Sequence, residues 1–249
     1  MIIAEIGLNH LGSKKYLEEY LDNLIGSSVD AITLQIREKS FYINSRYSKY
    51  QFNLNVYDEI CSRVKQSGKK FGIALSDLSL VPFFDQRVDF YKILSKDLGD
   101  KEFIDKLINV TNKSIFVSTG LSSYDAIDKF ISNIDPRVIN NVTLIHTRLS
   151  NKVEDTNLKA IEKMKSRFKT PIAFGNHCEN PIVTYAALAF EPTAVFIYTK
   201  GDKSTHHPDE KHAISLESVE QFSKNIKQVF KSIGDGCKEN IQNTIEGQE

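Results

Sequence analysis

The chain has 249 residues, of which 41% are hydrophobic and only 6 are proline. This length suffices for one large hydrophobic core and matches a single complete α/β barrel. Lysine plus arginine and aspartate plus glutamate each number 32, so the formal net charge is zero. A chain without a global basic field is not expected to bind nucleic acid or an anionic membrane surface.

The sequence also predicts the compartment. No apolar run reaches the roughly 18 residues of a membrane-spanning helix, and residues 1–5 lack the basic region and cleavage site of a signal peptide. The three cysteines, Cys61, Cys178 and Cys237, are far apart and form no CxxC pair. We therefore expect free thiols and a cytoplasmic protein.

Short β-branched segments alternate with longer amphipathic segments along the chain. The predicted strands cover residues 2–6, 31–36, 70–75, 90–93, 114–117, 141–146, 171–175 and 194–198. The predicted helices cover residues 14–24, 56–66, 101–110, 124–131, 158–168, 181–190 and 216–233, with a weak helical turn at 81–86.

Eight successive βα units with nearly continuous apolar strands predict a (β/α)8 TIM barrel spanning residues 1–233. The polar tail, residues 234–249, is expected to fray from the last helix. A doubly wound α/β fold is the alternative, but it would usually carry GxGxxG after the first strand, whereas residues 6–12 read IGLNHLG.

Polar residues gather at the predicted carboxyl ends of the strands, where the active site of such a barrel lies. On or after the first seven strands these are Glu5, Gln35, Arg37, Lys92, Ser95, Asp97, Ser118, Asn176 and His177. The loop after the eighth strand adds His206, His207, Asp209 and His212. Glu5 and Lys92 lie within apolar segments, so each needs a partner across the barrel, in a structural ion pair or in an active site.

Several of these residues allow two interpretations. The segment after Ser118 either caps the next helix, in competition with Ser122 or Ser123, or binds an anion. His177 is either a hydrogen-bonded core histidine or a metal ligand. The loop histidines and Asp209 have the composition of a metal site, but their place in a loop favours solvated polar residues.

Residues 3–12, IAEIGLNHLG, resemble the first strand and loop of the sialic acid synthases, in which an AE-x-G-x-NH-x-G segment is characteristic. Further similar blocks follow in order at 30–35 (DAITLQ), 91–95 (YKILS), 118–121 (STGL), 154–161 (EDTNLKAI) and 175–177 (GNH). The resemblance covers the predicted barrel nearly from end to end. It implies a phosphoenolpyruvate-dependent condensation with an aldose or an N-acylated amino sugar, which yields a nonulosonic acid and phosphate and requires magnesium or manganese.

The resemblance also implies roles for individual residues. Phosphoenolpyruvate would be held by Lys92, Ser95 and Ser118. The sugar would contact Asp97 and Asp209, and further substrate-binding candidates are Gln35, Arg37 and Asn176. Glu5 would lie close to the reacting centre, and His177 would be one metal ligand.

The sequence departs from the family pattern at several positions. A phosphoenolpyruvate-binding lysine aligns with Thr33, for which Arg37 is a candidate substitute, and the second metal-binding histidine of strand eight is missing from residues 196–200. Two alternatives follow: His177 holds the metal alone, with water and a carboxylate, or a second imidazole comes from His206, His207 or His212. The third-strand STPF segment, the serine of the SDH segment and the loop after strand six also differ. The antifreeze-like C-terminal domain is expected to be absent or supplied by another polypeptide.

Three functional hypotheses follow. The first is a phosphoenolpyruvate-condensing synthase with an altered aldehyde acceptor, a possible homodimer. The second is a Schiff-base aldolase that uses Lys92 or Lys200. The third is a non-catalytic or regulatory paralogue that keeps the fold and part of an anion site.

Overall fold

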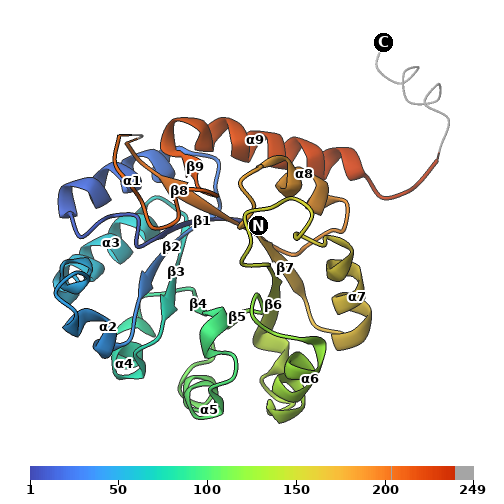
Figure 1. Ribbon diagram of the computed structural model, residues 1–249, viewed down its shortest axis with the longest axis horizontal. Helices are drawn as coiled ribbons and strands as arrows, with labels where there is room; N and C mark the ends of the chain where they lie inside the picture. Colours follow the sequence, from blue (N-terminus) through green and yellow to red (C-terminus); the bar gives the residue numbers. More distant parts are fainter. Residues whose placement is uncertain (203, 239–249) are drawn as a thin grey trace.

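The computed structural model describes residues 1–202 and 204–238, and within them eight parallel strands close into a barrel (Figure 1). The strands are β1 (Ile2–Gly7), β2 (Ala31–Ile36), β3 (Lys70–Leu75), β4 (Phe90–Ile93), β5 (Ser114–Ser118), β6 (Val142–His146), β7 (Ile172–Gly175) and β8 (Val195–Lys200). Each strand pairs with the next, and β8 pairs with β1. The predicted (β/α)8 TIM barrel is therefore confirmed, and the doubly wound alternative is wrong.

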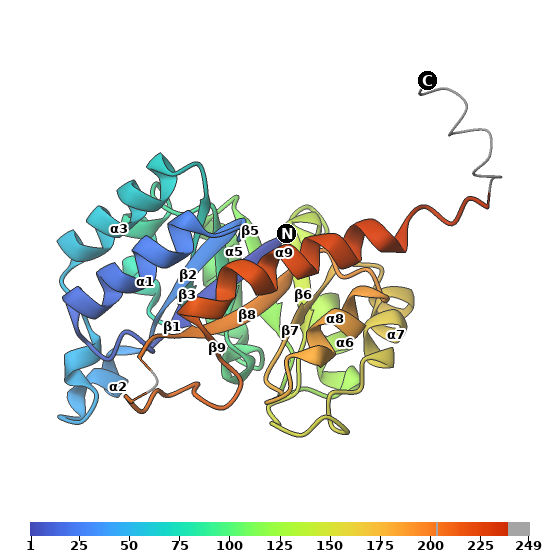
Figure 2. The ribbon, with the colours of Figure 1, turned by 90° about the horizontal axis from the view of Figure 1, so that it is seen from above.

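Helices surround this barrel (Figure 1). They are α1 (Lys14–Gly26), α2 (Lys39–Ile43), α3 (Leu54–Gln66), α4 (Val81–Phe84), α5 (Lys101–Val110), α6 (Tyr124–Asn133), α7 (Lys159–Phe168), α8 (Ile182–Leu188) and α9 (Leu216–Ile233). The sequence did not predict α2 or the two-residue strand β9 (Ile214–Ser215), because neither is long enough to show a hydrophobic period. Figure 2 shows the long α9 across α1 and α8, which it contacts.

Side-chain caps fix the starts of three helices. The Ser13 hydroxyl accepts a hydrogen bond from the Tyr16 N–H at the start of α1, and the Asp100 carboxylate does the same for Phe103 in α5. At α6 the cap is Ser123, which accepts from the Ala126 N–H. Because Ser123 satisfies that helix end, Ser118 is not needed as its cap.

Two apolar layers result from the alternation of side chains along the strands. Residues facing outward pack against the helices, whereas a smaller group fills the barrel interior: Ile3, Ala31, Phe90, Phe116, Ile145, Ala173, Ala194 and Phe196. Within the interior group, Phe116 makes edge-to-face contacts with Phe90 and Phe196, each at a ring separation of 5.2 Å. Residues two positions further along these strands point to the same interior and form the next layer.

The remaining sequence expectations concern the termini and the cysteines. Helix α9 ends at Ile233, and residues 239–249 of the predicted polar tail lie outside the described residues. Within the described part of the chain, none of the helices is both long enough and apolar enough to cross a bilayer. Cys61 and Cys178 are buried free thiols, and Cys237 is exposed.

The loop after β1 contains a histidine that makes stability depend on pH. His10 is fully buried, its Nδ1 accepts a hydrogen bond from the Gly12 N–H, and its ring lies 4.7 Å from that of Phe52. Burial lowers the pKa of His10 to about 4. Since the pKa is about 6.5 in the unfolded chain, the unfolded state binds the proton more readily. His10 therefore contributes full stability above pH 6.5 and loses it as the pH falls toward 4.

The variant His10→Asn keeps an oxygen that can accept from the Gly12 N–H but removes the titrating ring. We expect the free energy of unfolding of the native protein to fall between pH 6.5 and 4 more steeply than that of His10→Asn, by up to about 1.4 kcal/mol per pH unit. Urea unfolding across this range measures the difference. His206→Asn, at an exposed position on the surface, is the control and should keep the native slope. Equal slopes for the native protein and His10→Asn would contradict the prediction.

Candidate active site

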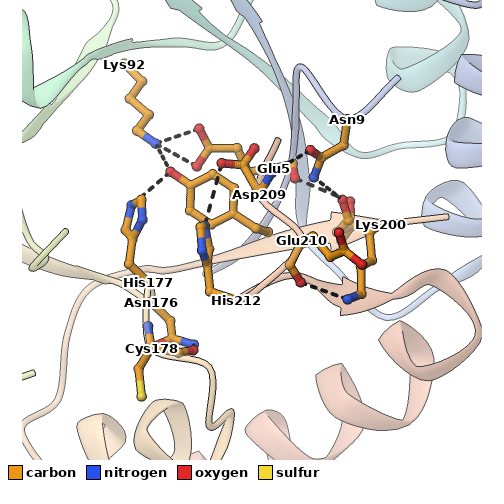
Figure 3. Close-up of polar contacts among 12 residues, drawn as sticks. Glu5, Asn9, Lys92, Asn176, His177, Cys178, Lys200, Asp209, Glu210 and His212 are labelled. Carbon is orange, nitrogen blue, oxygen red and sulfur yellow. Dashed lines mark hydrogen bonds and ion pairs between the residues drawn. The ribbon is translucent and has the colours of Figure 1, made fainter. Parts of the chain in front are cut away.

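A buried ion pair crosses the barrel interior directly above its apolar layer. Glu5 follows Ile3 on β1, and Lys92 follows Phe90 on β4, so the strand period places both side chains inside. The Lys92 ammonium lies 2.6 Å from each oxygen of the Glu5 carboxylate (Figure 3). Glu5 is 0% exposed and Lys92 4% exposed. The partner across the barrel that each charge requires is therefore the other residue.

Tyr198 links this ion pair to two histidines. Its hydroxyl lies 3.4 Å from the Lys92 ammonium and 3.2 Å from Nε2 of His177. The His177 ring lies 4.4 Å from the ring of His212, which in turn makes an edge contact with Tyr198 at 4.6 Å. Asp209 completes the group, with its Oδ1 3.7 Å from Nε2 of His212 (Figure 3). Residues from β1, β4, β8, the segment after β7 and the loop after β8 thus lie close together.

Burial determines the charge of these groups. It lowers the pKa of His177 to about 3 and that of His212 to about 4, and the Lys92 charge adds to both shifts. Burial also raises the pKa of Tyr198 well above its usual value, while burial and the Glu5 charge raise the pKa of Asp209 to about 7. At neutral pH both imidazoles are therefore neutral, the phenol keeps its proton and Asp209 is close to its titration midpoint.

The loop between β8 and β9 is fixed to the barrel by side chains from the N-terminal part of the chain. Asn9 donates from Nδ2 to the Thr199 carbonyl at 2.8 Å and accepts at Oδ1 from the Asp209 N–H at 3.1 Å. The Tyr20 hydroxyl oxygen accepts from the Gly201 N–H at 2.8 Å. Gly7, at φ +56°, turns the end of β1 and leaves room for Asp209, whose Oδ2 would lie 3.1 Å from a Cβ at that position.

The three loop histidines have different surroundings. His206 is 91% exposed and pairs with Glu210, whereas His207 is buried with its Nε2 2.7 Å from the Tyr16 hydroxyl. His212 is the one of the three that packs against His177. His207 therefore helps to hold the loop, and His212 belongs to the site.

A second polar group lies at the ends of β4 and β5. The hydroxyl oxygens of Ser95 and Ser118 are 2.7 Å apart, and the Gly120 N–H donates to the Ser95 oxygen at 3.1 Å. Nearby, the Asp97 carboxylate accepts from the Ser76 hydroxyl at 2.8 Å and from the Lys96 ammonium at 2.6 Å. The paired hydroxyls supply short hydrogen-bond donors of the kind that bind phosphate or carboxylate oxygens.

Other predicted residues lie apart from the ion pair or serve the local backbone. Arg37 donates to Glu38 at 3.1 Å, and its guanidinium stacks 4.4 Å from the centre of the Phe41 ring. Asn176 exchanges two hydrogen bonds with the backbone of Cys178. The Lys200 ammonium donates to the Glu210 carbonyl at 2.8 Å.

On β2, Gln35 shares the inward face with Thr33, whose buried hydroxyl has no hydrogen-bond partner. Asn9 and Tyr198 lie among the polar residues at the predicted strand ends, and Thr33 aligns with a family lysine, but none of the three received a role from the sequence. The alternation of side chains along a strand could have placed Tyr198 and Thr33 inside the barrel. Each lies two residues beyond an interior apolar residue of its own strand.

The residues of this site fit a divalent cation in one respect. Across residues 1–202 and 204–238 there is no cluster of three or more His, Cys, Asp or Glu side chains arranged to hold a metal ion. However, two neutral imidazoles are adjacent, and Nε2 of His212 is buried without a hydrogen-bond partner. Imidazole nitrogens are common ligands of divalent metals. The donor set therefore suits a cation that takes two protein ligands and completes its coordination with water or substrate oxygens.

A (β/α)8 barrel with a buried carboxylate–ammonium pair at the carboxyl ends of its strands is the architecture of a barrel enzyme. Residues 20–238 match the NeuB family, so the chain belongs to this family, and the protein is an enzyme of the sialic acid synthase type.

The similar proteins agree with this membership. An N,N'-diacetyllegionaminic acid synthase of Campylobacter jejuni is 24% identical over 96% of this chain and 78% of its own length. An uncharacterised protein of Methanocaldococcus jannaschii is 28% identical over 95% of this chain and 73% of its own length. The crystal structure of an N-acetylneuraminic acid synthetase from Leptospira borgpetersenii superposes with a TM-score of 0.88 at 21% identity, covering 99% of this chain and 90% of that one. This last likeness supports the fold.

Proposed function

We propose that the protein condenses phosphoenolpyruvate with the open-chain aldehyde of an aldose or an N-acylated amino sugar, releasing phosphate and forming a 3-deoxy-2-keto sugar acid. The observation that carries the proposal is the buried Lys92–Glu5 pair at the carboxyl ends of the strands, where the Lys92 nitrogen also contacts the Tyr198 hydroxyl. Membership of the NeuB family supports the same chemistry.

The reaction forms one carbon–carbon bond and breaks one carbon–oxygen bond. C3 of phosphoenolpyruvate attacks the aldehyde carbon, and the aldehyde oxygen takes up a proton to become a hydroxyl. Water adds to C2, the bond between C2 and the bridging oxygen breaks, and phosphate leaves with that oxygen. One water is consumed for each phosphate released, and C2 becomes the ketone.

Each group of the site has a task in this scheme. The Lys92 ammonium and the hydroxyls of Ser95 and Ser118 hold the phosphate and carboxylate of phosphoenolpyruvate. Glu5 fixes the Lys92 ammonium and lies next to the reacting carbons. His177 would help to hold a divalent magnesium or manganese ion, which would supply Lewis-acid polarisation of the aldehyde oxygen. Asp97 and Asp209 contact the acceptor sugar, and Gln35, Arg37 and Asn176 are further substrate-binding candidates.

The geometry favours this scheme over a Schiff-base mechanism. A Schiff base requires a neutral amine, whereas the Lys92 nitrogen is held by two carboxylate oxygens, and the Lys200 nitrogen contacts the Glu210 carbonyl. Borohydride trapping with pyruvate tests this directly, and a covalent adduct would support the aldolase. The cytoplasmic location and the homodimer remain predictions.

The decisive experiment measures phosphate release from phosphoenolpyruvate with magnesium or manganese, across a panel of aldoses and N-acetylated hexosamines. We expect release that depends on both the aldehyde and the metal. Lys92→Ala should abolish this release, whereas Lys14→Ala, at an exposed lysine of α1, should retain it. If phosphoenolpyruvate binds but no acceptor in the panel gives phosphate release, the result would instead favour a non-catalytic paralogue.

Replacing either paired hydroxyl should weaken phosphoenolpyruvate binding. A hydrogen bond to a charged group contributes about 1.5–3 kcal/mol, so Ser95→Ala or Ser118→Ala is expected to raise KM for phosphoenolpyruvate roughly 10- to 100-fold. Steady-state kinetics with the acceptor at saturation measures the change. Ser132→Ala, on the exposed face of α6, should leave KM unchanged. An unaltered KM in both site variants would remove these hydroxyls from the phosphate site.

A further inference from the structure

We infer that His177 and His212 together form the protein part of a divalent cation site, with the second imidazole supplied by the loop between β8 and β9. The inference rests on the proposed function for the purpose of the cation, but binding itself is measured without substrate. Nothing in the sequence distinguishes His212 from His206 and His207 as the second ligand.

Ring geometry supports a shared ion. An ion bound to an imidazole nitrogen at about 2.1 Å lies roughly 3.2 Å from the ring centre, so two imidazoles at right angles around one ion have centres about 4.6 Å apart. The centres of the His177 and His212 rings are 4.4 Å apart, with an angle of 38° between the ring planes. The ring separation is therefore close to the one expected for two imidazoles at right angles around a common ion.

The free nitrogen of His212 gives a second, independent observation. Its side chain is 9% exposed, and Nε2 has no hydrogen-bond partner. A buried polar atom without a partner costs about 1–3 kcal/mol, so it normally indicates a ligand or water at that point. Asp209 Oδ1, at 3.7 Å, is too far for a hydrogen bond but close enough to attract a cation to the same place.

The loop that carries His212 is held in place by hydrogen bonds, as a metal ligand on a loop requires. A ligand on a loop needs support from neighbouring groups to hold its geometry. Here the loop is held at both ends of the relevant stretch, by Tyr20 at Gly201 and by Asn9 at Asp209, three residues before His212. Just after it, Ile214 pairs with Thr199 of β8. The backbone that carries His212 is thus fixed before any ion binds.

Tyr198 occupies the position between the two rings and the ion pair. Its hydroxyl is 3.2 Å from Nε2 of His177, a long hydrogen bond, and 3.4 Å from the Lys92 ammonium. An ion at Nε2 of His177 would replace this hydrogen bond, while the hydroxyl keeps its contact with Lys92. Tyr198 therefore belongs beside the ion as a neighbour that separates it from the ammonium charge.

The test measures Mn²⁺ binding by electron paramagnetic resonance without substrate, together with the nitrogen couplings of the bound ion. We expect one ion per chain with couplings from two imidazoles. His177→Ala and His212→Ala should each weaken binding at least tenfold and leave one imidazole coupling, since even the loss of an outer partner of a metal ligand costs about 10- to 100-fold. His206→Ala, a matched variant in the same loop, should match the native protein.

A measurement on the native protein makes the test independent of variant folding. Substoichiometric Mn²⁺ should broaden the ring proton signals of His177 and His212 more than those of His146 and His206. Unchanged affinity and couplings in His212→Ala, or equal broadening of all the histidines, would overturn the inference. Native Mn²⁺ binding with two imidazole couplings but no phosphate release with any acceptor would overturn the proposed function and leave the cation site intact.

Discussion

Replacing Lys92 with methionine is expected to abolish phosphate release and to lower the free energy of unfolding by about 3–5 kcal/mol. The substitution keeps the length of the side chain but leaves the Glu5 carboxylate buried without its counter-charge. An uncompensated carboxylate in the barrel interior is costly, because burial removes the water that would otherwise solvate it. Urea unfolding followed by circular dichroism gives the stability, and the phosphate assay gives the activity.

The double variant Glu5→Leu/Lys92→Met separates the two effects. Removing both charges of a buried pair is often neutral or stabilising, so most of the lost stability should return while activity stays absent. Lys14→Met is the control, because the Lys14–Glu59 pair is exposed and such pairs contribute little to stability. Full activity in Lys92→Met would exclude the ammonium from the reaction, and no recovery in the double variant would mean that the instability arises from packing.

The second large effect is expected for Phe116→Ala, which should lower the free energy of unfolding by about 3–5 kcal/mol. Phe116 lies between Phe90 and Phe196 in the barrel interior and contacts both rings edge to face. Its removal leaves a cavity directly beneath the layer of Glu5 and Lys92. Because a closed barrel cannot easily collapse inward, the surrounding strands should fill little of that space.

The measurement is again urea unfolding, with Leu121→Ala as the matched control. Leu121 is 64% exposed, so its truncation should change stability by less than about 0.5 kcal/mol. Phe116→Leu keeps most of the buried volume and should fall between the two. A loss below about 1 kcal/mol in Phe116→Ala would show that the interior layer does not support the barrel in the way we describe.

Much of the fold follows from hydrophobic periodicity. Strands β2, β3 and β4 begin and end where the pattern predicted, as do α5 and α9, because each is a clear apolar run or amphipathic period with polar boundaries. α2 was not predicted, since five residues span barely more than one helical turn. Loop segments carry no such period, so the contacts of the loop after β8 could not be predicted from the sequence.

The candidate site, too, could be predicted only in part from the sequence. Charged residues within apolar strands identified Glu5 and Lys92, because burial of an unpaired charge is too costly to occur without a partner. Ser95 and Ser118 were predicted as separate residues, and the barrel brings their hydroxyls within 2.7 Å. Arg37 was a candidate replacement for a missing lysine charge, but its guanidinium pairs with Glu38 and stacks on Phe41. Whether it also contacts substrate remains a prediction.

The order of strands and helices, the barrel class and the inward-facing charges could be predicted from the sequence, because they depend on the local alternation of apolar and polar residues. The choice among the three loop histidines beside His177 could not, because it depends on hydrogen bonds between segments about 200 residues apart. Asn9 and Tyr20, near the start of the chain, fix the loop at Asp209 and Gly201. Such contacts arise only when the barrel closes and β8 pairs with β1.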